Sequence, residues 1–248
     1  MTTLENEHVS SPSTYRETGT FRRVWDWPTR LFHWGLAASI LGAYVSNRLG
    51  ASYFSLHLFF GYATIVLVVF RLIWGFVGTH HARFVNFLEG PRGVLRYVSA
   101  VGRKRHTRYA GHNPLGALMV VTLLSVTGAQ AALGLFGNDE IFNLGPLAGF
   151  VSKETSLLLT SLHRKLFYVI LFALVFHVGA VLIHVFVKRE PLILAMITGC
   201  KPAHIVQPDE AIASSRSLLA ILLFATLAVA LIIGLDFVPS PDTDVASF

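Results

Sequence analysis

Five long apolar blocks constrain this chain more than any other feature of its 248 residues. They cover residues 29–46, 55–76, 115–136, 157–187 and 218–235, and each is near the ~20 residues that cross the hydrocarbon of a bilayer. Hydrophobic residues make up 53% of the sequence and charged residues only 14%, unlike the composition of a soluble domain. The blocks therefore predict an all-α fold, an integral membrane helical bundle with five transmembrane helices.

Lysine and arginine are concentrated in alternate connecting segments. They are frequent before the first block, between the second and third, and after the fourth, whereas the other side has only Arg48, Lys153, Arg164 and Lys165. By the positive-inside rule, this pattern predicts a multi-pass membrane protein with a cytoplasmic N-terminus and a C-terminus on the outer side. The net charge of +6 is then a matter of topology, and no nucleic-acid partner is expected.

The blocks and the segments between them predict five regions. These are a polar cytoplasmic tail (1–21), a four-helix core (22–201), a linker (202–216), a fifth transmembrane helix (217–236) and an outer tail (237–248). The tail has no apolar stretch typical of a signal peptide, so the first helix is expected to persist. Because Cys200 is the only cysteine, the chain by itself forms no disulfide and no thiolate-held iron–sulfur cluster.

Two histidines of the fourth block, His163 and His177, lie fourteen residues apart. At 100° per residue they return to within about 40° of the same helix face, separated by about 21 Å along the axis. The topology offers each a partner at matching depth, His57 near the outer start of the second helix and His33 near the inner start of the first. The pairs His57–His163 and His33–His177 therefore predict two bis-histidine haem b sites, one outer and one inner.

Each membrane histidine has a simpler interpretation, a hydrogen bond between helices or a position at the interface. Four histidines at two matched depths are harder to explain in that way. His184 lies seven residues after His177 and is another candidate ligand on the same helix. Its spacing from His163 is too long, and that from His177 too short, for two stacked haems, so we interpret His184 as interfacial. The remaining histidines are expected to be solvated, and they are His80, His81, His106, His112 and His204, with His8 in the tail.

Three basic residues are candidates for binding cofactor carboxylates. Arg71 follows His57 by fourteen residues, so it projects on the same face at the level of the inner haem. It is expected either to bind an inner haem propionate or a quinone headgroup, or simply to extend to the interface. Arg164 and Lys165 adjoin His163 and are expected to bind outer propionates or attract an anionic donor, or else to mark the helix end. The glycines of the blocks would let a flat macrocycle approach the helix backbone, but they equally allow close helix packing, which is the safer interpretation.

The blocks contain no Asp or Glu before Asp236, which argues against a proton pump or a cation-coupled transporter. The sequence also shows no nucleophile paired with a base and no phosphate-binding glycine loop. No catalytic residue is therefore predicted, and any catalysis is expected to depend on the cofactors.

Four motifs resemble the prokaryotic cytochrome b561 family, which includes the cytochrome b subunits of nickel–iron hydrogenases. They are VWDWPTRLFHW at 24–34, FRLIWGFVGTHHARF at 70–84, GHNPLG at 111–116, and LHRKLF at 162–167 followed by His177. The resemblance covers about residues 22–201. It implies a di-haem four-helix core whose ligands match His33, His57, His163 and His177, with ubiquinone or another quinone as a substrate. It also implies a place in the bacterial inner membrane, where the outer side, with the C-terminus, is periplasmic.

The resemblance leaves the outer partner open. Members of the family meet a soluble c-type cytochrome or another periplasmic redox protein, a hydrogenase, or superoxide, which one branch oxidises while it reduces ubiquinone. We expect transmembrane electron transfer between quinone and a periplasmic redox protein, with a superoxide oxidase and a hydrogenase subunit as alternatives. The fifth block carries no histidine and lies outside the matched core.

Overall fold

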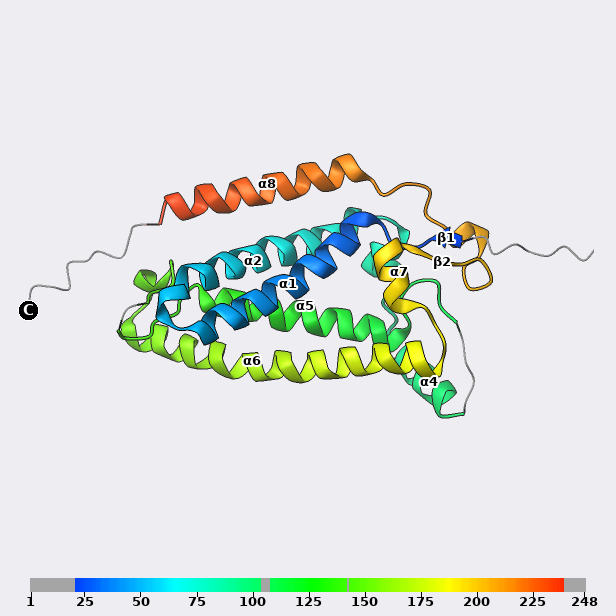
Figure 1. Cartoon of the computed structure of the whole chain (residues 1–248), viewed down its shortest axis with the longest axis horizontal. Helices are drawn as coiled ribbons and strands as arrows, with labels where there is room; N and C mark the ends of the chain where they lie inside the picture. Colours follow the sequence, from blue (N-terminus) through cyan, green and yellow to red (C-terminus); the bar gives the residue numbers. More distant parts are fainter. Residues whose placement is uncertain (1–20, 104–107, 142, 239–248) are drawn as a thin grey trace, which may run out of the picture.

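The computed structural model describes residues 21–103, 108–141 and 143–238. Four long helices lie side by side as a bundle, and a fifth, α8, runs along its outside (Figure 1). The bundle helices are α1 (Trp27–Leu49), α2 (Phe54–Val77), α5 (Pro114–Gly134) and α6 (Lys153–Leu182), and α8 covers Ser217–Asp236. A π-helical turn, Ile183–Val187, extends α6.

Short elements connect the long helices. The short α-helices are α3 (Phe84–Phe87), α4 (Pro91–Gly102) and α7 (Leu192–Thr198). Single 3-10 turns occur at Ala51–Tyr53, His80–Ala82, Ala148–Phe150 and Pro208–Glu210.

All five apolar blocks are helical, with ends within a few residues of the predicted ones. Within the described residues, four helices are long and apolar enough to cross a membrane, and they are Ala51–Val77, Pro114–Gly134, Lys153–Val187 and Ser217–Asp236. With 23 residues α1 has the length, but polar residues near both of its ends, such as Arg30 and Arg48, make it less apolar. It nevertheless packs along α2 within the bundle. Its membrane crossing stays a prediction.

Side-chain caps explain where three bundle helices begin. The residue before each helix accepts a hydrogen bond from a backbone N–H three positions later, which satisfies a group that the helix itself leaves without a partner. The capping residues are Asp26 for α1, Asn113 for α5 and Ser152 for α6. A proline in the first turn of α1 and of α5 supports the same start.

The two ends of the bundle differ. At one end α1 begins, α2 ends, α5 begins and α6 ends, and this end also holds α4, α7 and two short strands (Figure 1). Strands β1 (Phe21–Arg23) and β2 (Cys200–Pro202) pair antiparallel, a small departure from the all-α prediction. We call this the basic end, because it carries most of the arginines and lysines, and the other the opposite end.

The segment 202–216, expected to be a linker, packs against the basic end. Val206 is fully buried in a cluster with Val24 and Trp25. The Arg22 guanidinium donates hydrogen bonds to the carbonyls of Ala203, at 3.0 Å, and Val206. The segment thus completes the basic end on its way to α8. The expected tail regions at 1–20 and 239–248 lie outside the described residues.

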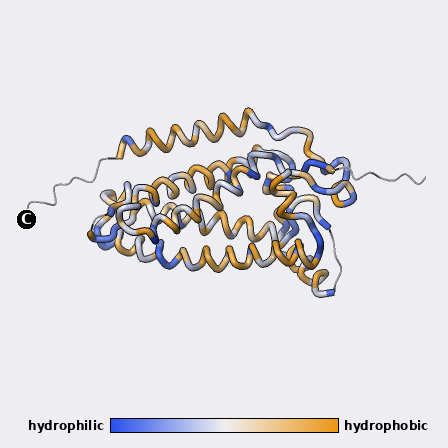
Figure 2. Tube along the Cα trace, in the orientation of Figure 1, coloured by the Kyte–Doolittle hydropathy of each residue, from blue (hydrophilic) through white to orange (hydrophobic). Residues whose placement is uncertain are grey.

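The interior and the surface of the bundle are both apolar. A core cluster joins Phe32, Leu67, Phe70, Trp74 and Leu124. Large apolar side chains also face outward along α6 and α8, for example Phe172, 65% exposed, and Leu218, 71% exposed. Figure 2 shows hydrophobic residues along the length of the helices and hydrophilic ones gathered at the two ends. Such a surface suits lipid rather than water.

Candidate functional site

The structure brings the four predicted histidines together in two pairs, at two levels of the bundle. The imidazole rings of His33 on α1 and His177 on α6 have centroids 6.2 Å apart and planes tilted by 50°. Those of His57 on α2 and His163 on α6 are also 6.2 Å apart, with planes at 80°. Each pair thus joins α6 to a different helix, as the spacing of the sequence predicts.

The distance within each pair fits a metal ion bound between the rings. A metal–imidazole nitrogen bond is about 2 Å long, and the nitrogen lies about 1.1 Å from the ring centre. A metal between two imidazoles therefore separates the ring centres by about 6 Å, close to the distance found in both pairs. Two imidazoles suit the axial positions of a haem iron, whose other four ligands are porphyrin nitrogens.

Backbone carbonyls of neighbouring helices orient one of the pairs. His57 Nδ1 lies 2.8 Å from the carbonyl oxygen of Ala43, and His163 Nδ1 lies 2.8 Å from that of Gln130. If each Nδ1 donates its proton there, each Nε2 keeps a lone pair for a metal. The side-chain nitrogen of Gln130 lies 3.3 Å from His163 Nε2, a contact that a metal would replace. In the other pair, His33 Nδ1 is buried and has no hydrogen-bond partner among the described residues.

A cavity of about 570 Å³ adjoins the His57–His163 pair. Small residues line it beside the imidazoles, among them Gly61 on α2 and Gly134 on α5. A Cβ added at Gly61 would meet no atom within 4 Å, so this glycine leaves open space rather than a helix contact. At Gly42, in contrast, a Cβ would come within 2.4 Å of the Phe60 ring, as the packing interpretation expects.

The three predicted basic residues have different surroundings. Arg71 is only 2% exposed, its guanidinium carbon lies 4.9 Å from the Phe84 ring centre, and both terminal nitrogens lack a hydrogen-bond partner within the described chain. The Arg71 side chain is therefore enclosed by the protein, which favours a role in the site over extension to the interface. Arg164 and Lys165 are exposed at the opposite end, where Arg164 lines the cavity and Lys165 does not. The sequence interpretation missed Arg48, which lines the same cavity.

The expectation of solvated histidines is wrong for His81 and His112. His81 is 7% exposed, and its Nε2 lies 2.7 Å from the Glu210 carbonyl oxygen. The His112 ring packs 4.8 Å from the rings of both Trp25 and Phe87. Burial, followed by the nearby positive charge of Arg71, lowers the pKa of His112 to about 3, so its imidazole is neutral at physiological pH.

The other histidines fit their predictions where the structure describes them. His80 and His204 are exposed, whereas His8 and His106 lie outside the described residues. His184 Nδ1 lies 3.0 Å from Glu190 Oε2 near the end of α6, away from both pairs. The sequence did carry a sign that His81 and His112 are not simply solvated, because each lies inside one of the four family motifs. In the structure both rings contact Trp25, which belongs to a third motif.

Comparisons with known proteins relate the chain to one family. Residues 24–199 match the family profile described as prokaryotic cytochrome b561. The chain is 29% identical to a protein of Azotobacter vinelandii named "Probable Ni/Fe-hydrogenase B-type cytochrome subunit", and 28% identical to a protein of the same name from Azotobacter chroococcum mcd 1. Both alignments span 223 residues and cover 75% of this chain and 90% of the relative. No solved structure matches significantly.

The family match covers most of the chain and includes all four paired histidines. The apolar helices, the histidine pairs and the comparisons together indicate a membrane electron-transfer protein with b-type haem. The chain belongs to the prokaryotic cytochrome b561 family.

Proposed function

We propose that this chain is a di-haem cytochrome b that transfers electrons between the quinone pool and a redox partner at the outer face of the membrane. His33 and His177 hold one haem b, and His57 and His163 hold the other. The observation that carries the proposal is the 6.2 Å separation of the rings in both pairs. A haem held by such a pair would supply an iron that accepts and releases one electron.

The membrane and the charge pattern give the transfer a direction in space. Membrane-spanning helices in a prokaryotic family point to the bacterial inner membrane. The positive-inside rule places the basic end, with His33–His177, on the cytoplasmic side and the opposite end, with His57–His163, on the periplasmic side. Arg71, buried at the basic end, is the candidate to bind a propionate of the inner haem or a quinone headgroup.

Three outer partners fit this arrangement. A soluble c-type cytochrome or a similar periplasmic protein fits a simple relay, whereas the names of the Azotobacter relatives favour a Ni/Fe hydrogenase at least as well. Superoxide is a third candidate, because Arg164 and Lys165 offer positive charge beside the outer pair. Co-purification identifies a protein partner, and superoxide-dependent quinone reduction by the chain alone identifies the oxidase.

The haem sites are tested by stoichiometry and by removing single ligands. A pyridine haemochrome measurement on the purified chain should give two haems b per chain. His57→Ala and His163→Ala should each remove one and the same haem, and His33→Ala and His177→Ala the other, as resolved redox titrations would show. One haem or none in the unmodified chain, or loss of the same haem from His33→Ala and His57→Ala, would contradict the proposal.

A further inference from the structure

Two arginines from different helices share the cavity of the His57–His163 pair. Arg48 lies in the last turn of α1, and Arg164 follows His163 directly on α6. Both line the 570 Å³ cavity that the two imidazoles also line. Lys165, the next residue of α6, is exposed outside the cavity.

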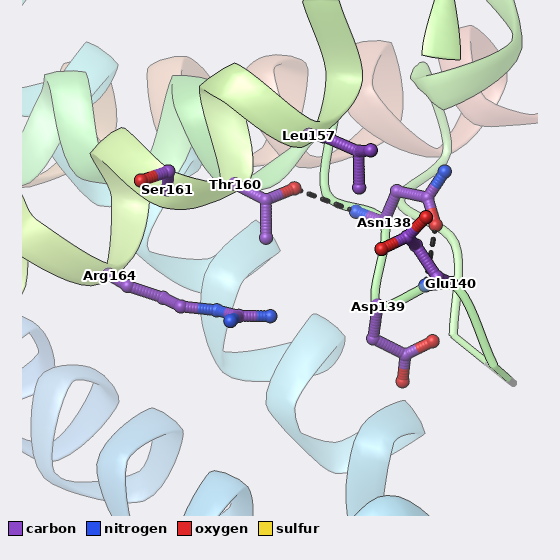
Figure 3. Close-up of a pocket in the computed structure, with 7 residues that line it drawn as sticks. All are labelled: Asn138, Asp139, Glu140, Leu157, Thr160, Ser161 and Arg164. Carbon is purple, nitrogen blue, oxygen red and sulfur yellow. Dashed lines mark hydrogen bonds between the residues drawn. The ribbon is translucent and has the colours of Figure 1, made fainter. Parts of the chain in front are cut away.

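The cavity changes from apolar to polar toward the opposite end. Apolar side chains of the helices, such as Ile40, Leu58 and Ile170, line the cavity together with the uncharged Thr64, Thr127 and Gln130. Its charged lining residues include Arg48 in the last turn of α1 and Arg164, and the loop at 137–139 lines it too. We call this charged part the mouth. Arg164 also lines a smaller pocket of about 220 Å³, in which its side chain extends from α6 toward Asn138–Glu140 (Figure 3). Asp139 lines both spaces and adds one negative charge to the mouth.

This gradient matches the shape of haem b, which has an apolar macrocycle and two carboxylates on one edge. A guanidinium binds a carboxylate through two parallel hydrogen bonds, and it does so better than an ammonium group. We propose that Arg48 and Arg164 bind the propionates of the haem held by His57 and His163, so that its carboxylate edge faces the opposite end. The inference rests on the proposed function for the position of this haem.

Removing either arginine has two consequences. An unpaired propionate favours the ferric iron, so the midpoint potential of this haem falls. We expect up to a tenfold shift of the ferrous-to-ferric ratio, which is 59 mV for one electron. The same change removes a contact that retains the haem, so haem leaves the chain faster. Because both arginines are exposed, salt should weaken the effect on the potential.

The experiment compares Arg48→Gln, Arg164→Gln and Arg164→Lys with Lys165→Gln in the purified haem-loaded chain. Lys165→Gln is the matched control, because it removes the same charge one residue away from the cavity lining. The readouts are redox titration of both haems and the rate of haem transfer to excess apomyoglobin. Arg48→Gln and Arg164→Gln should each lower the midpoint potential of the His57–His163 haem and accelerate its loss at least fivefold. The other haem should be unchanged. Arg164→Lys should keep the potential but lose haem faster.

The outcomes separate this inference from the proposed function. If the arginine variants behave like Lys165→Gln, the propionates lie elsewhere and the inference is overturned, even though two haems are present. If the unmodified chain holds fewer than two haems, or if His163→Ala loses none, the proposed function itself fails.

Discussion

Gly61 leaves open the space that a macrocycle beside His57 would need. It lies one helical turn after His57 and lines the cavity, with no atom within 4 Å of an added Cβ. Gly61→Leu should place an isobutyl group in that space and abolish binding of the His57–His163 haem, while the other haem stays. Haem content and a redox titration of the purified variant measure this.

Gly234→Leu is the matched control for this prediction, because Gly234 is a helical glycine of α8 with equally open surroundings. It should keep both haems. If Gly61→Leu also retains both, the open space at Gly61 serves lipid or another helix contact and not a haem.

Arg71 is a charge buried at the level of the His33–His177 pair. Its guanidinium has no hydrogen-bond partner among the described residues, so burial of the charge is unfavourable. A cation–π contact with the Phe84 ring offsets part of that free-energy cost. Arg71→Gln should lower the potential of the His33–His177 haem if the charge acts alone, because a nearby cation favours the reduced iron. If it binds a propionate, that haem should be lost more readily instead.

The other haem, about 20 Å away by helix rise, should barely respond to Arg71→Gln. Arg92→Gln removes the same charge from the exposed surface of α4 and is the control. Redox titration and haem content of both variants decide the matter. If Arg71→Gln leaves both quantities unchanged, Arg71 has no part in the site.

The pairing of the histidines was predictable from the sequence, but their polar surroundings were not. A spacing of fourteen residues on one helix and the alternation of spans are enough to place four residues at two depths. Arg48 lines the cavity because α1 continues as far as Leu49, and the sequence pattern does not fix where this helix ends. His81 is buried because the connecting segment with Glu210 folds back over the basic end, and His112 packs against Trp25 and Phe87 from other segments. No periodicity in the sequence predicts these contacts.

Among the elements, α1 depends most on contacts outside its own sequence. It is the least apolar of the five long helices, and the buried carboxylate of Asp26 ties its start to α2. One oxygen accepts the Thr29 N–H at 2.6 Å as the helix cap. The other accepts the Trp74 indole N–H at 3.2 Å and the Thr79 hydroxyl. This carboxylate therefore helps to set where His33 lies relative to α2.

Asp26→Ala should remove a helix cap and two tertiary hydrogen bonds to a charged acceptor, a loss of about 2–5 kcal/mol. The apparent thermal midpoint of the haem-loaded chain in detergent should fall accordingly, with Asp26→Asn less affected because it keeps an acceptor. Asn113→Ala is the control, since Asn113 caps α5 by a single bond to the Gly116 N–H at 2.8 Å. Equal effects of Asp26→Ala and Asn113→Ala would show that the link to α2 contributes little.

The apolar blocks predicted the long helices well because their signal extends over about twenty residues. The β1–β2 pairing and the packed segment 202–216 have no such signal. A strand of three residues has no measurable alternation, and the polar composition of 202–216 is that of a linker. Only the position of β1 beside β2, and of Val206 against Trp25, makes them part of the folded end.

At the scale of the whole molecule, the distribution of charge predicts which end faces the cytoplasm. The structure separates a basic end from an opposite end with fewer basic residues, and the two histidine pairs lie at different levels between them. Orientation therefore decides which pair meets a periplasmic partner. If the chain were inserted the other way, the His33–His177 pair would be the one near a periplasmic partner, and Arg71 would lie on the periplasmic side.

Cys200 makes this orientation directly measurable. It is the only cysteine of the chain, lies in β2 at the basic end and is partly exposed. A membrane-impermeant maleimide should label it in inverted membrane vesicles and leave it unlabelled in intact spheroplasts, because the positive-inside rule predicts that the basic end faces the cytoplasm. Gly149→Cys in a Cys200→Ser background places the thiol at the exposed opposite end and should give the reverse pattern. Labelling of Cys200 in spheroplasts, with Gly149→Cys protected there, would invert the topology and with it the assignment of the outer haem.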